Sequence, residues 1–316
     1  MPVLSQPTID IPDQHGRTAV VTGANSGLGL ETAAELARHG AHVILTGRSP
    51  ERLEAAMADV RLRVPAASVA PVTLDLASLA SIRKAAATIL AVSEAIDLLV
   101  DNAGVMAIKR SETEDGFERQ FGTNHLGHFA FTGLLLPALL HRQGSRVVVV
   151  TSFMRLLGRL DFEDLHGRRR YGRWKAYNQS KLANLLFATE LERRLRATPG
   201  AETISVAAHP GYAATNLQRG DSLTQSAALS IGNTLFAQTA AAGALPILYA
   251  ATAPGVVGGA LYGPGTLGLW GRPRKERLDW KGRNEEAARR LWEASVEETG
   301  VAYPELFAGG SSGRAA

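Results

Sequence analysis

Residues 18–48 carry the sequence TAVVTGANSGLGLETAAELARHGAHVILTGR, and this stretch decides the fold class. A short apolar run over 18–22 stops at a glycine-rich turn, and a helical pattern follows over 28–39. A second apolar run covers 42–46. Both runs are apolar throughout rather than alternating. Each is therefore predicted to be a strand buried on both faces, as in a parallel sheet covered by helices.

The same alternation continues along the chain. Further strands are predicted at 68–74, 97–101, 146–151, 204–208 and, last, 259–262. Helices are predicted at 50–63, with Ser49 as N-cap, and at 79–92, 116–140 and 174–196. This order predicts an α/β fold, a single Rossmann-type doubly wound parallel sheet with helices on both faces. No repeat or linker divides residues 1–316, so we expect one domain: a core at about 16–265, an embedded substrate lid at about 212–250 and a C-terminal extension at 266–316.

The composition excludes several classes of function. The 316 residues include no cysteine, which rules out disulfides, thiolate metal sites and a cysteine nucleophile, and which fits a reducing cytoplasm. The net charge of +4 is too small to indicate a nucleic-acid partner. The N-terminus lacks the pattern of a signal peptide, and the most apolar stretch, 227–253, is interrupted by polar residues. We therefore expect a cytoplasmic protein without a membrane span.

The glycine-rich turn over 22–29 has the context of a dinucleotide site, because it joins a strand to a helix. Gly23 permits a tight turn, Gly27 lets a pyrophosphate approach the backbone, and Gly29 permits close packing of the helix. The helix N-terminus then offers free N–H groups to the phosphates. A purely structural turn is the alternative. The contacts predicted here are Gly23, Asn25, Ser26, Gly27, Leu28 and Gly29.

The end of the second strand indicates which nicotinamide cofactor is bound. An NAD site usually has an acid there to accept a hydrogen bond from the ribose 2′-hydroxyl. Residues 46–49 contain no carboxylate, and Arg48 could bind a 2′-phosphate through its planar guanidinium. The alternative is a solvated surface arginine. The sequence therefore favours NADP(H) over NAD(H).

Other predicted contacts follow the third and fourth strands, at the sheet edge where ligands bind in open α/β folds. Asp75, next to Leu76, could accept from the adenine amino group or could cap the next helix. Asn102 could tie neighbouring strands together, and Gly104, after Ala103, could let the backbone pass close to the cofactor.

Candidate catalytic residues lie in the second half of the chain. Tyr177 and Lys181 are four residues apart in a predicted helix, so they share one face. A lysine ammonium there would lower the pKa of the phenol and suit it to acid–base work. A surface pair is the alternative. Ser152 favours the catalytic interpretation, because it follows a buried strand and would face the same rim of the sheet.

These residues together resemble the short-chain dehydrogenase/reductase family over roughly residues 16–265. The matching motifs are Thr22-Gly23-x-x-x-Gly27-x-Gly29, Asn102-Ala103-Gly104, Asn124, Ser152, Tyr177-x-x-x-Lys181 and Pro210-Gly211. The segments 22–48, 124–137, 161–165 and 177–195 further resemble its retinol-dehydrogenase-like branch, which includes light-dependent protochlorophyllide reductases and usually prefers NADP(H). Two departures from the usual pattern are Asp101, where the family commonly has Asn, and the 25-residue distance from Ser152 to Tyr177, which this branch shares.

The resemblance implies an oxidoreductase that transfers a hydride between NADP(H) and a carbonyl or alcohol of a lipophilic small molecule. Tyr177 is then the acid or base, Ser152 binds the reacting oxygen, and Lys181 lowers the Tyr177 pKa and binds the nicotinamide ribose. Asn124 helps to hold a water that links Lys181 to solvent. Pro210, Gly211 and Thr215 line the nicotinamide carboxamide. A homodimer could form through the helices of Asn124 and Tyr177.

Two other functions fit the same fold. One is a non-catalytic NADP-binding sensor or scaffold, but such relatives usually lose the Tyr or Lys kept here. The other is protochlorophyllide reduction, which the lack of cysteine disfavours.

Several remaining patterns are interpreted without a function. His125 and His128 are expected to pack or form hydrogen bonds, because no third metal ligand is apparent. The cluster of Arg168, Arg169, Arg170 and Arg173 is expected to be a solvated loop, because acidic residues lie nearby in the sequence; the alternative is a patch that attracts an acidic substrate or a membrane surface. Trp270, Trp280 and Trp292 are expected to pack in the core or under a lid.

Overall fold

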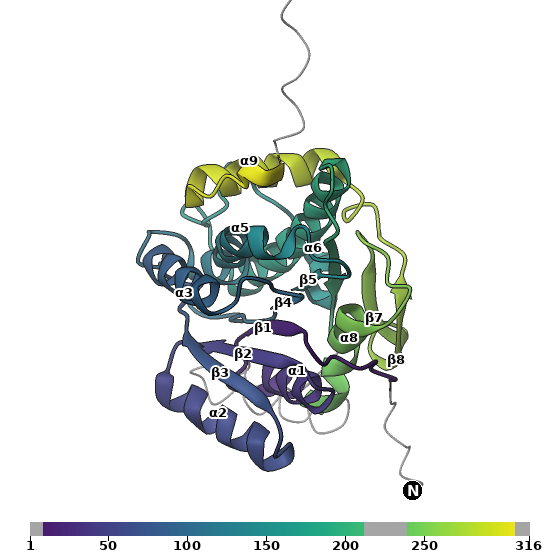
Figure 1. Cartoon of the computed structure of the whole chain (residues 1–316). Coiled ribbons are helices and arrows are strands. Elements are labelled where there is room, and N and C mark those ends of the chain that lie inside the picture. The colour runs from purple at the N-terminus through teal and green to yellow at the C-terminus, as the bar shows by residue number, and fades with distance from the viewer. Residues whose placement is uncertain (1–8, 212–238, 307–316) are drawn as a thin grey trace, which may run out of the picture.

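A computed structural model describes residues 9–211 and 239–306, which are built around one eight-stranded sheet (Figure 1). The strands are β1 (Thr18–Thr22), β2 (His42–Gly47), β3 (Ser68–Thr73), β4 (Leu98–Asp101), β5 (Arg146–Val150), β6 (Ile204–Ala208), β7 (Leu261–Thr266) and β8 (Trp270–Glu276). Across the sheet they lie in the order β3-β2-β1-β4-β5-β6-β7-β8. All neighbours from β3 to β7 pair in parallel, which confirms the predicted fold class.

The strand order reverses between β1 and β4. From β1 the chain winds outward through β2 to β3, and it then returns to β4 on the other side of β1. The loops after β1 and β4 therefore leave the sheet toward opposite faces, and a crevice opens between them at the carboxyl ends of the strands. This crevice is where the glycine-rich turn and the Asn102-Ala103-Gly104 motif meet.

Helices cover both faces of the sheet, as predicted. One face is covered by α1 (Gly27–Arg38), α2 (Pro50–Arg63) and α8 (Ala240–Thr252). The other is covered by α3 (Leu79–Val92), α5 (Gly127–Leu139) and α6 (Arg173–Ala197), with α9 (Glu285–Thr299) over them (Figure 1). Shorter turns of helix are α4 (Arg119–Phe121), the π-helical η1 (Gly122–Leu126) and the 3₁₀ segments η2 (Phe153–Leu157) and η4 (Pro304–Leu306).

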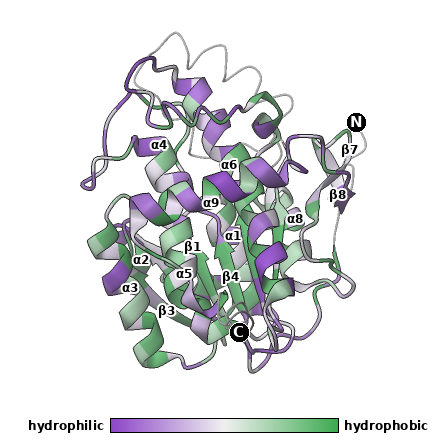
Figure 2. Cartoon of the chain, turned by 90° about the horizontal axis from the view of Figure 1, so that it is seen from above, coloured by the Kyte–Doolittle hydropathy of each residue, from purple (hydrophilic) through white to green (hydrophobic). Residues whose placement is uncertain are grey.

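Burial on both faces explains why the central strands are apolar throughout. In β1, Ala19 and Val21 join the core beneath α1 and α8, whereas Val20 joins the core beneath α3 and α5. Figure 2 shows this as hydrophobic strands between helices whose outer sides are hydrophilic. At the start of α2, Ser49 accepts a hydrogen bond from the Arg52 N–H, so the predicted N-cap is confirmed.

The prediction that the last strand lies at 259–262 is wrong in one respect. Strand β7 is followed by β8, which pairs with it in antiparallel orientation, so the segment 266–316 contributes an edge strand. The sequence of β8, WGRPRKE, contains a proline and four charged residues, and most of its side chains are exposed. Because an edge strand does not need an apolar run, the pattern that revealed the other strands was absent here.

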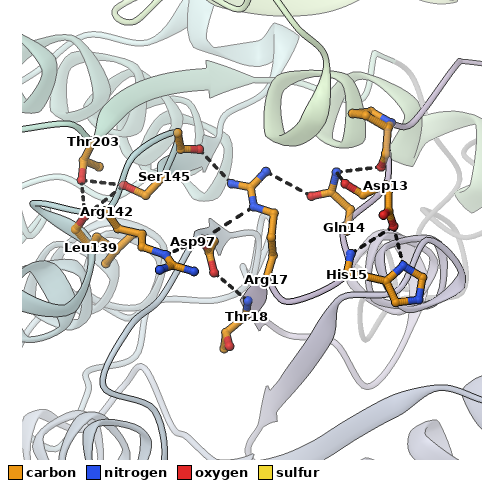
Figure 3. Close-up of polar contacts among 12 residues, drawn as sticks. Asp13, Gln14, His15, Arg17, Thr18, Asp97, Leu139, Arg142, Ser145 and Thr203 are labelled. Atoms are coloured by element: carbon orange, nitrogen blue, oxygen red, sulfur yellow. Dashed lines mark hydrogen bonds and ion pairs between the residues drawn. The ribbon is translucent and has the colours of Figure 1, made fainter.

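A buried carboxylate joins three elements at the amino-terminal ends of the central strands (Figure 3). Asp97 accepts a hydrogen bond from the Thr18 N–H at 2.8 Å and another from Arg142 Nε at 2.9 Å. Arg17 Nε lies 3.7 Å from the same carboxylate. These contacts fix the starts of β1 and β4 relative to the loop that enters β5, far from the crevice.

Within 9–211 and 239–306, no helix is long and apolar enough to cross a bilayer. The same residues contain no group of three or more His, Asp or Glu side chains that could hold a metal ion.

Candidate active site

The three glycines of the turn differ in what surrounds them. Gly23 has a positive φ of 66°, and a Cβ there would lie 3.0 Å from the Ala103 Cβ. A Cβ on Gly29 would lie 2.5 Å from the Gly23 carbonyl oxygen, so only glycine allows α1 to pack this closely. Gly27, with a φ of 57°, has no atom within 4 Å of the Cβ position. The backbone at Gly27 therefore faces open space at the N-terminus of α1.

A cavity of about 410 Å³ occupies the crevice. Its lining includes every residue predicted from the glycine-rich turn and from the ends of β2, β3 and β4. Lining residues that were not predicted include Thr46, Arg52, Val105, Met106, Ile108 and Thr123. Of these, Arg52 could have been predicted from the sequence, because it lies four residues after Arg48, in the helix that follows the same strand.

The cavity wall at the end of β2 carries positive charge. Arg48 and Arg52 both line it. Glu51, in the same segment, accepts a hydrogen bond from the Ser49 hydroxyl at 2.6 Å and is not part of the lining. The segment that follows β2 therefore offers two guanidinium groups to a ligand, and the carboxylate in the lining, Asp75, comes from the segment that follows β3.

The ends of β1 and β4 are tied together by Asn102 and Thr22. Asn102 Nδ2 donates to the Thr22 carbonyl at 2.8 Å, and the Thr22 side-chain oxygen accepts from the N–H groups of Asn102 and Ala103. The predicted tie between neighbouring strands is confirmed. Asp75 accepts from the Ala77 N–H, whereas α3 is capped by Ser78. Asp75 is therefore not the helix cap that the sequence allowed.

Ser152, Tyr177 and Lys181 come together as the family pattern implies. Ser152 follows β5 and begins η2, where its side-chain oxygen accepts from the Met154 N–H at 3.2 Å. Its hydroxyl forms a hydrogen bond with Tyr177 on α6. One turn along α6, Lys181 Nζ donates to the Val150 carbonyl at 3.1 Å. Tyr177 and Lys181 are both buried, so the surface-pair alternative is excluded.

Burial dominates the electrostatics of this group. It raises the pKa of Tyr177, and the Ser152 hydrogen bond lowers it only in part. The net shift is therefore upward, whereas the separate lowering of the Tyr177 pKa by the Lys181 charge stays a prediction. Burial also lowers the pKa of Lys181 to about 8.

Asn124 lies in the π-helical segment η1, and its side chain is fully engaged. Its Oδ1 accepts from the Val105 N–H at 2.8 Å, and its Nδ2 donates to the Val105 carbonyl and to Ser180 Oγ at 2.9 Å. A Cβ on Gly104 would lie 3.1 Å from Asn124 Oδ1 and 3.6 Å from Lys181 Nζ. A side chain at position 104 would therefore crowd Asn124 and Lys181 at the cavity wall, and glycine avoids this.

The last predicted cofactor contacts, Pro210, Gly211 and Thr215, follow β6 in the sequence. Gly211 has a φ of 71°, and a Cβ there would lie 2.4 Å from the Leu269 carbonyl, so the Pro210-Gly211 turn sits against the β7–β8 hairpin. Thr215 lies outside the described residues, as does most of the expected lid.

The residues expected to have no functional role behave in different ways. His125 and His128 are buried and form hydrogen bonds, as expected. The side chains of Arg168–Arg170 are exposed, and their backbone N–H groups bind the Asp164 carboxylate.

The three tryptophans were expected to share one environment and do not. Trp292 is buried against Phe129. The expectation of packing is wrong for Trp280 and Trp270, which are 70% and 41% exposed, because both follow or lie on the edge strand.

Three comparisons place the chain among known proteins. Residues 17–226 match the family model described as short chain dehydrogenase. Human retinol dehydrogenase 13 is 41% identical over 297 residues, covering 92% of this chain and 87% of the human protein. Mouse polyprenol dehydrogenase is 42% identical over 295 residues, covering 92% and 86%. The crystal structure of an uncharacterized protein from Mycobacterium paratuberculosis shares 42% identity and a TM-score of 0.78, covering 93% of this chain and 97% of that one.

Proposed function

The chain belongs to the short-chain dehydrogenase family, and we propose that it is an NADP-dependent oxidoreductase that interconverts a carbonyl and an alcohol of a lipophilic small molecule. The family uses nicotinamide cofactors, and its retinol-dehydrogenase-like branch acts on alcohols and carbonyls. The observation that carries the proposal is the buried contact between Tyr177 and Ser152, with Lys181 one turn further along the same helix.

The residues around the cavity fit a nicotinamide dinucleotide. Gly27 leaves the N-terminus of α1 open to the pyrophosphate, and no side-chain bond from Ser26 caps that helix end. Arg48 and Arg52 support NADP over NAD, because a guanidinium can bind a 2′-phosphate and the lining residues that directly follow β2 include no acid to bind the 2′-hydroxyl.

The chemistry follows from the protonation states of the buried residues. A bound nicotinamide supplies or accepts the hydride. Tyr177, whose raised pKa keeps its proton at neutral pH, donates that proton to the carbonyl oxygen during reduction. The Ser152 hydroxyl stabilises negative charge that develops on the same oxygen. Lys181 contributes a positive charge, which favours the phenolate left after proton transfer.

The lipophilic character of the substrate is supported by exposed apolar groups beside the catalytic residues. Phe153 directly follows Ser152 and is 39% exposed, and Trp174 stands over the Tyr177 ring at a centroid distance of 6.2 Å. Two relatives are named for retinol and polyprenol, which are isoprenoid alcohols. Isoprenoid aldehydes and alcohols are therefore the first compounds to test.

The experiment is a panel of aldehydes, ketones and alcohols followed by NADPH absorbance, with NADH in parallel. We expect turnover of long apolar substrates, and we expect Tyr177→Phe to lower kcat by about a hundredfold or more while NADPH still binds. Tyr249→Phe, at a tyrosine of α8 outside the site, is the matched control. NADPH binding without turnover of any compound would favour the sensor or scaffold instead. A homodimer and a cytoplasmic location remain proposals, which light scattering and cell fractionation test.

A further inference from the structure

Glu276 lies on β8, the strand that the sequence pattern did not reveal, and its carboxylate is shared by two segments of the site. Its Oε1 lies 3.0 Å from His209 Nε2, and its Oε2 lies 3.7 Å from a guanidinium nitrogen of Arg155. His209 directly precedes Pro210-Gly211, and Arg155 follows Ser152 by three residues. We propose that Glu276 is a positioning residue that fixes the Ser152 turn and the Pro210-Gly211 turn relative to each other.

The contact with His209 determines which ring nitrogen carries the proton. The Gly211 N–H donates to His209 Nδ1 at 3.2 Å, so Nδ1 must be unprotonated. The proton is then on Nε2, which donates to Glu276. Because a carboxylate accepts only from a protonated nitrogen, Glu276 selects the tautomer that leaves Nδ1 free to hold Gly211. His209 is fully buried, so water does not replace either partner.

The contact with Arg155 acts on the other segment. The Arg155 side chain is only 4% exposed and also donates to Asp279 at 3.0 Å. Its backbone N–H donates to the Ser152 carbonyl at 3.1 Å. The turn that carries the Ser152 hydroxyl is therefore anchored by a buried guanidinium held between two carboxylates.

Strand β7 has glycine where this arrangement needs space. A Cβ on Gly263 would lie 2.3 Å from His209 Nε2 and 2.4 Å from Glu276 Oε1, so any larger residue would separate the pair. Burial raises the pKa of Glu276, but its hydrogen bond with His209 and the guanidinium charges of Arg155 and Arg274 outweigh it, so the pKa lies below its usual value. Glu276 is thus ionised at neutral pH and can serve both partners.

This inference rests on the proposed function, since Ser152 is taken to bind the reacting oxygen and Pro210-Gly211 to line the nicotinamide. Because Glu276 contacts both segments, it would hold Ser152 and Pro210-Gly211 in a fixed position relative to each other. Two variants distinguish the contact with His209 from the contact with Arg155. Glu276→Gln keeps an oxygen that accepts from His209 but removes the charge that faces Arg155, whereas Glu276→Ala removes both contacts.

The test compares purified full-length variants by thermal melting, by the fluorescence of bound NADPH, and by kcat and KM for the best carbonyl substrate. We expect Glu276→Ala to lower kcat by about tenfold or more, to raise the KM for NADPH and to change the nicotinamide emission. We expect Glu276→Gln to lower kcat with little change in NADPH emission or KM. Arg155→Met should match the Gln variant, and combining it with Glu276→Ala should add little further loss. Glu297→Gln, on the exposed face of α9, is the matched control.

Unchanged kcat, KM and emission in a folded Glu276→Ala protein would overturn the proposal, even if its melting temperature fell. Equal losses in the Gln and Ala variants would also overturn the proposal, because the contacts with His209 and Arg155 would then have no separate effects. If the wild type binds NADPH but reduces no carbonyl, the proposed function fails. The emission of the Ala and Gln variants then still shows whether Glu276 orders the nicotinamide end of the site.

Discussion

The side-chain oxygen of Thr22 and Nε2 of His128 lie 2.8 Å apart in the interior, which joins the end of β1 to α5. The other ring nitrogen, Nδ1, lies 2.9 Å from the Asn124 carbonyl, which can only accept. Nδ1 therefore carries the proton, and Nε2 accepts from the Thr22 hydroxyl. Burial lowers the pKa of His128 to about 3, so the ring stays neutral at neutral pH.

Replacing His128 should damage both stability and activity. His128→Leu leaves the Thr22 hydroxyl and the Asn124 carbonyl without this partner in a buried place, and we expect a loss of about 1–3 kcal/mol in the free energy of unfolding. The turn and η1 also border the cofactor cavity, so kcat/KM should fall by about tenfold. Urea unfolding and steady-state kinetics measure the two effects, with His141→Leu at an exposed position as the control. A stable variant with wild-type kinetics would contradict this role for His128.

Most strands and turn residues that the sequence predicts leave a signal in the local pattern, whereas β8, Glu276 and Arg155 leave none. Strands β1, β2, β4, β5 and β6 are buried on both faces, so each leaves an apolar run, and the glycines at 23 and 29 are required by contacts that no Cβ allows. Strand β8 is an edge strand without such a run. Glu276 and Arg155 were missed for a related reason. Their importance depends on contacts across 121 positions of sequence, and nothing in the local pattern of either residue indicates the other.

The buried carboxyl of Asp101 should make folding stability depend on pH. Burial raises its pKa from 3.8 to about 8, and the hydrogen bond from Thr132 lowers it only in part. Between these two pH values the folded protein keeps a proton that the unfolded chain releases, so the contribution of Asp101 is fully present below pH 3.8 and is lost as the pH rises toward 8.

Asp101→Asn removes this titration and keeps an oxygen for the Thr132 hydroxyl. We expect the melting temperature of the variant, relative to the wild type, to rise from pH 5 to about pH 8 and to level off above that. Scanning calorimetry across this range measures the difference, with Asp59→Asn at the surface as the control. A difference that does not vary with pH would show that Asp101 is not the group responsible.

The Asp97 carboxylate at the amino-terminal ends of β1 and β4 should matter for stability and not for catalysis. Asp97→Ala leaves the Thr18 N–H and two guanidinium groups without their acceptor in a mostly buried place. We expect a loss of about 2–4 kcal/mol in the free energy of unfolding. Below the melting temperature, kcat and KM should stay within about twofold of the wild type, because the catalytic groups lie at the other ends of the strands. Urea unfolding and kinetics at 20 °C test both halves, and an activity loss without a stability loss would contradict them.

The pKa of Lys181 predicts the alkaline limb of the activity profile. Burial lowers it to about 8, so the ammonium charge is present at pH 7 and is lost as the pH rises through 8. Since that charge favours the phenolate formed from Tyr177, kcat/KM for carbonyl reduction should fall above pH 8. Lys181→Met should be slower by about a hundredfold and should lose this limb, whereas Lys175→Met, exposed on the same helix, should keep it. A wild-type profile that is flat between pH 7 and pH 9 would contradict the assignment.

Arg48 should set the preference between the two cofactors. A charge-assisted hydrogen bond to a 2′-phosphate contributes about 1.5–3 kcal/mol, so Arg48→Ser should raise the KM for NADPH by about 10- to 100-fold and leave the KM for NADH nearly unchanged. Arg52 lines the same wall, and Arg52→Ser should have a smaller effect in the same direction, because this side chain starts one turn further from the end of β2. Arg38→Ser, on the exposed side of α1, is the control. If Arg48→Ser weakened both cofactors equally, the guanidinium would be acting on a part of the cofactor that NAD and NADP share, and the preference would have to come from another residue.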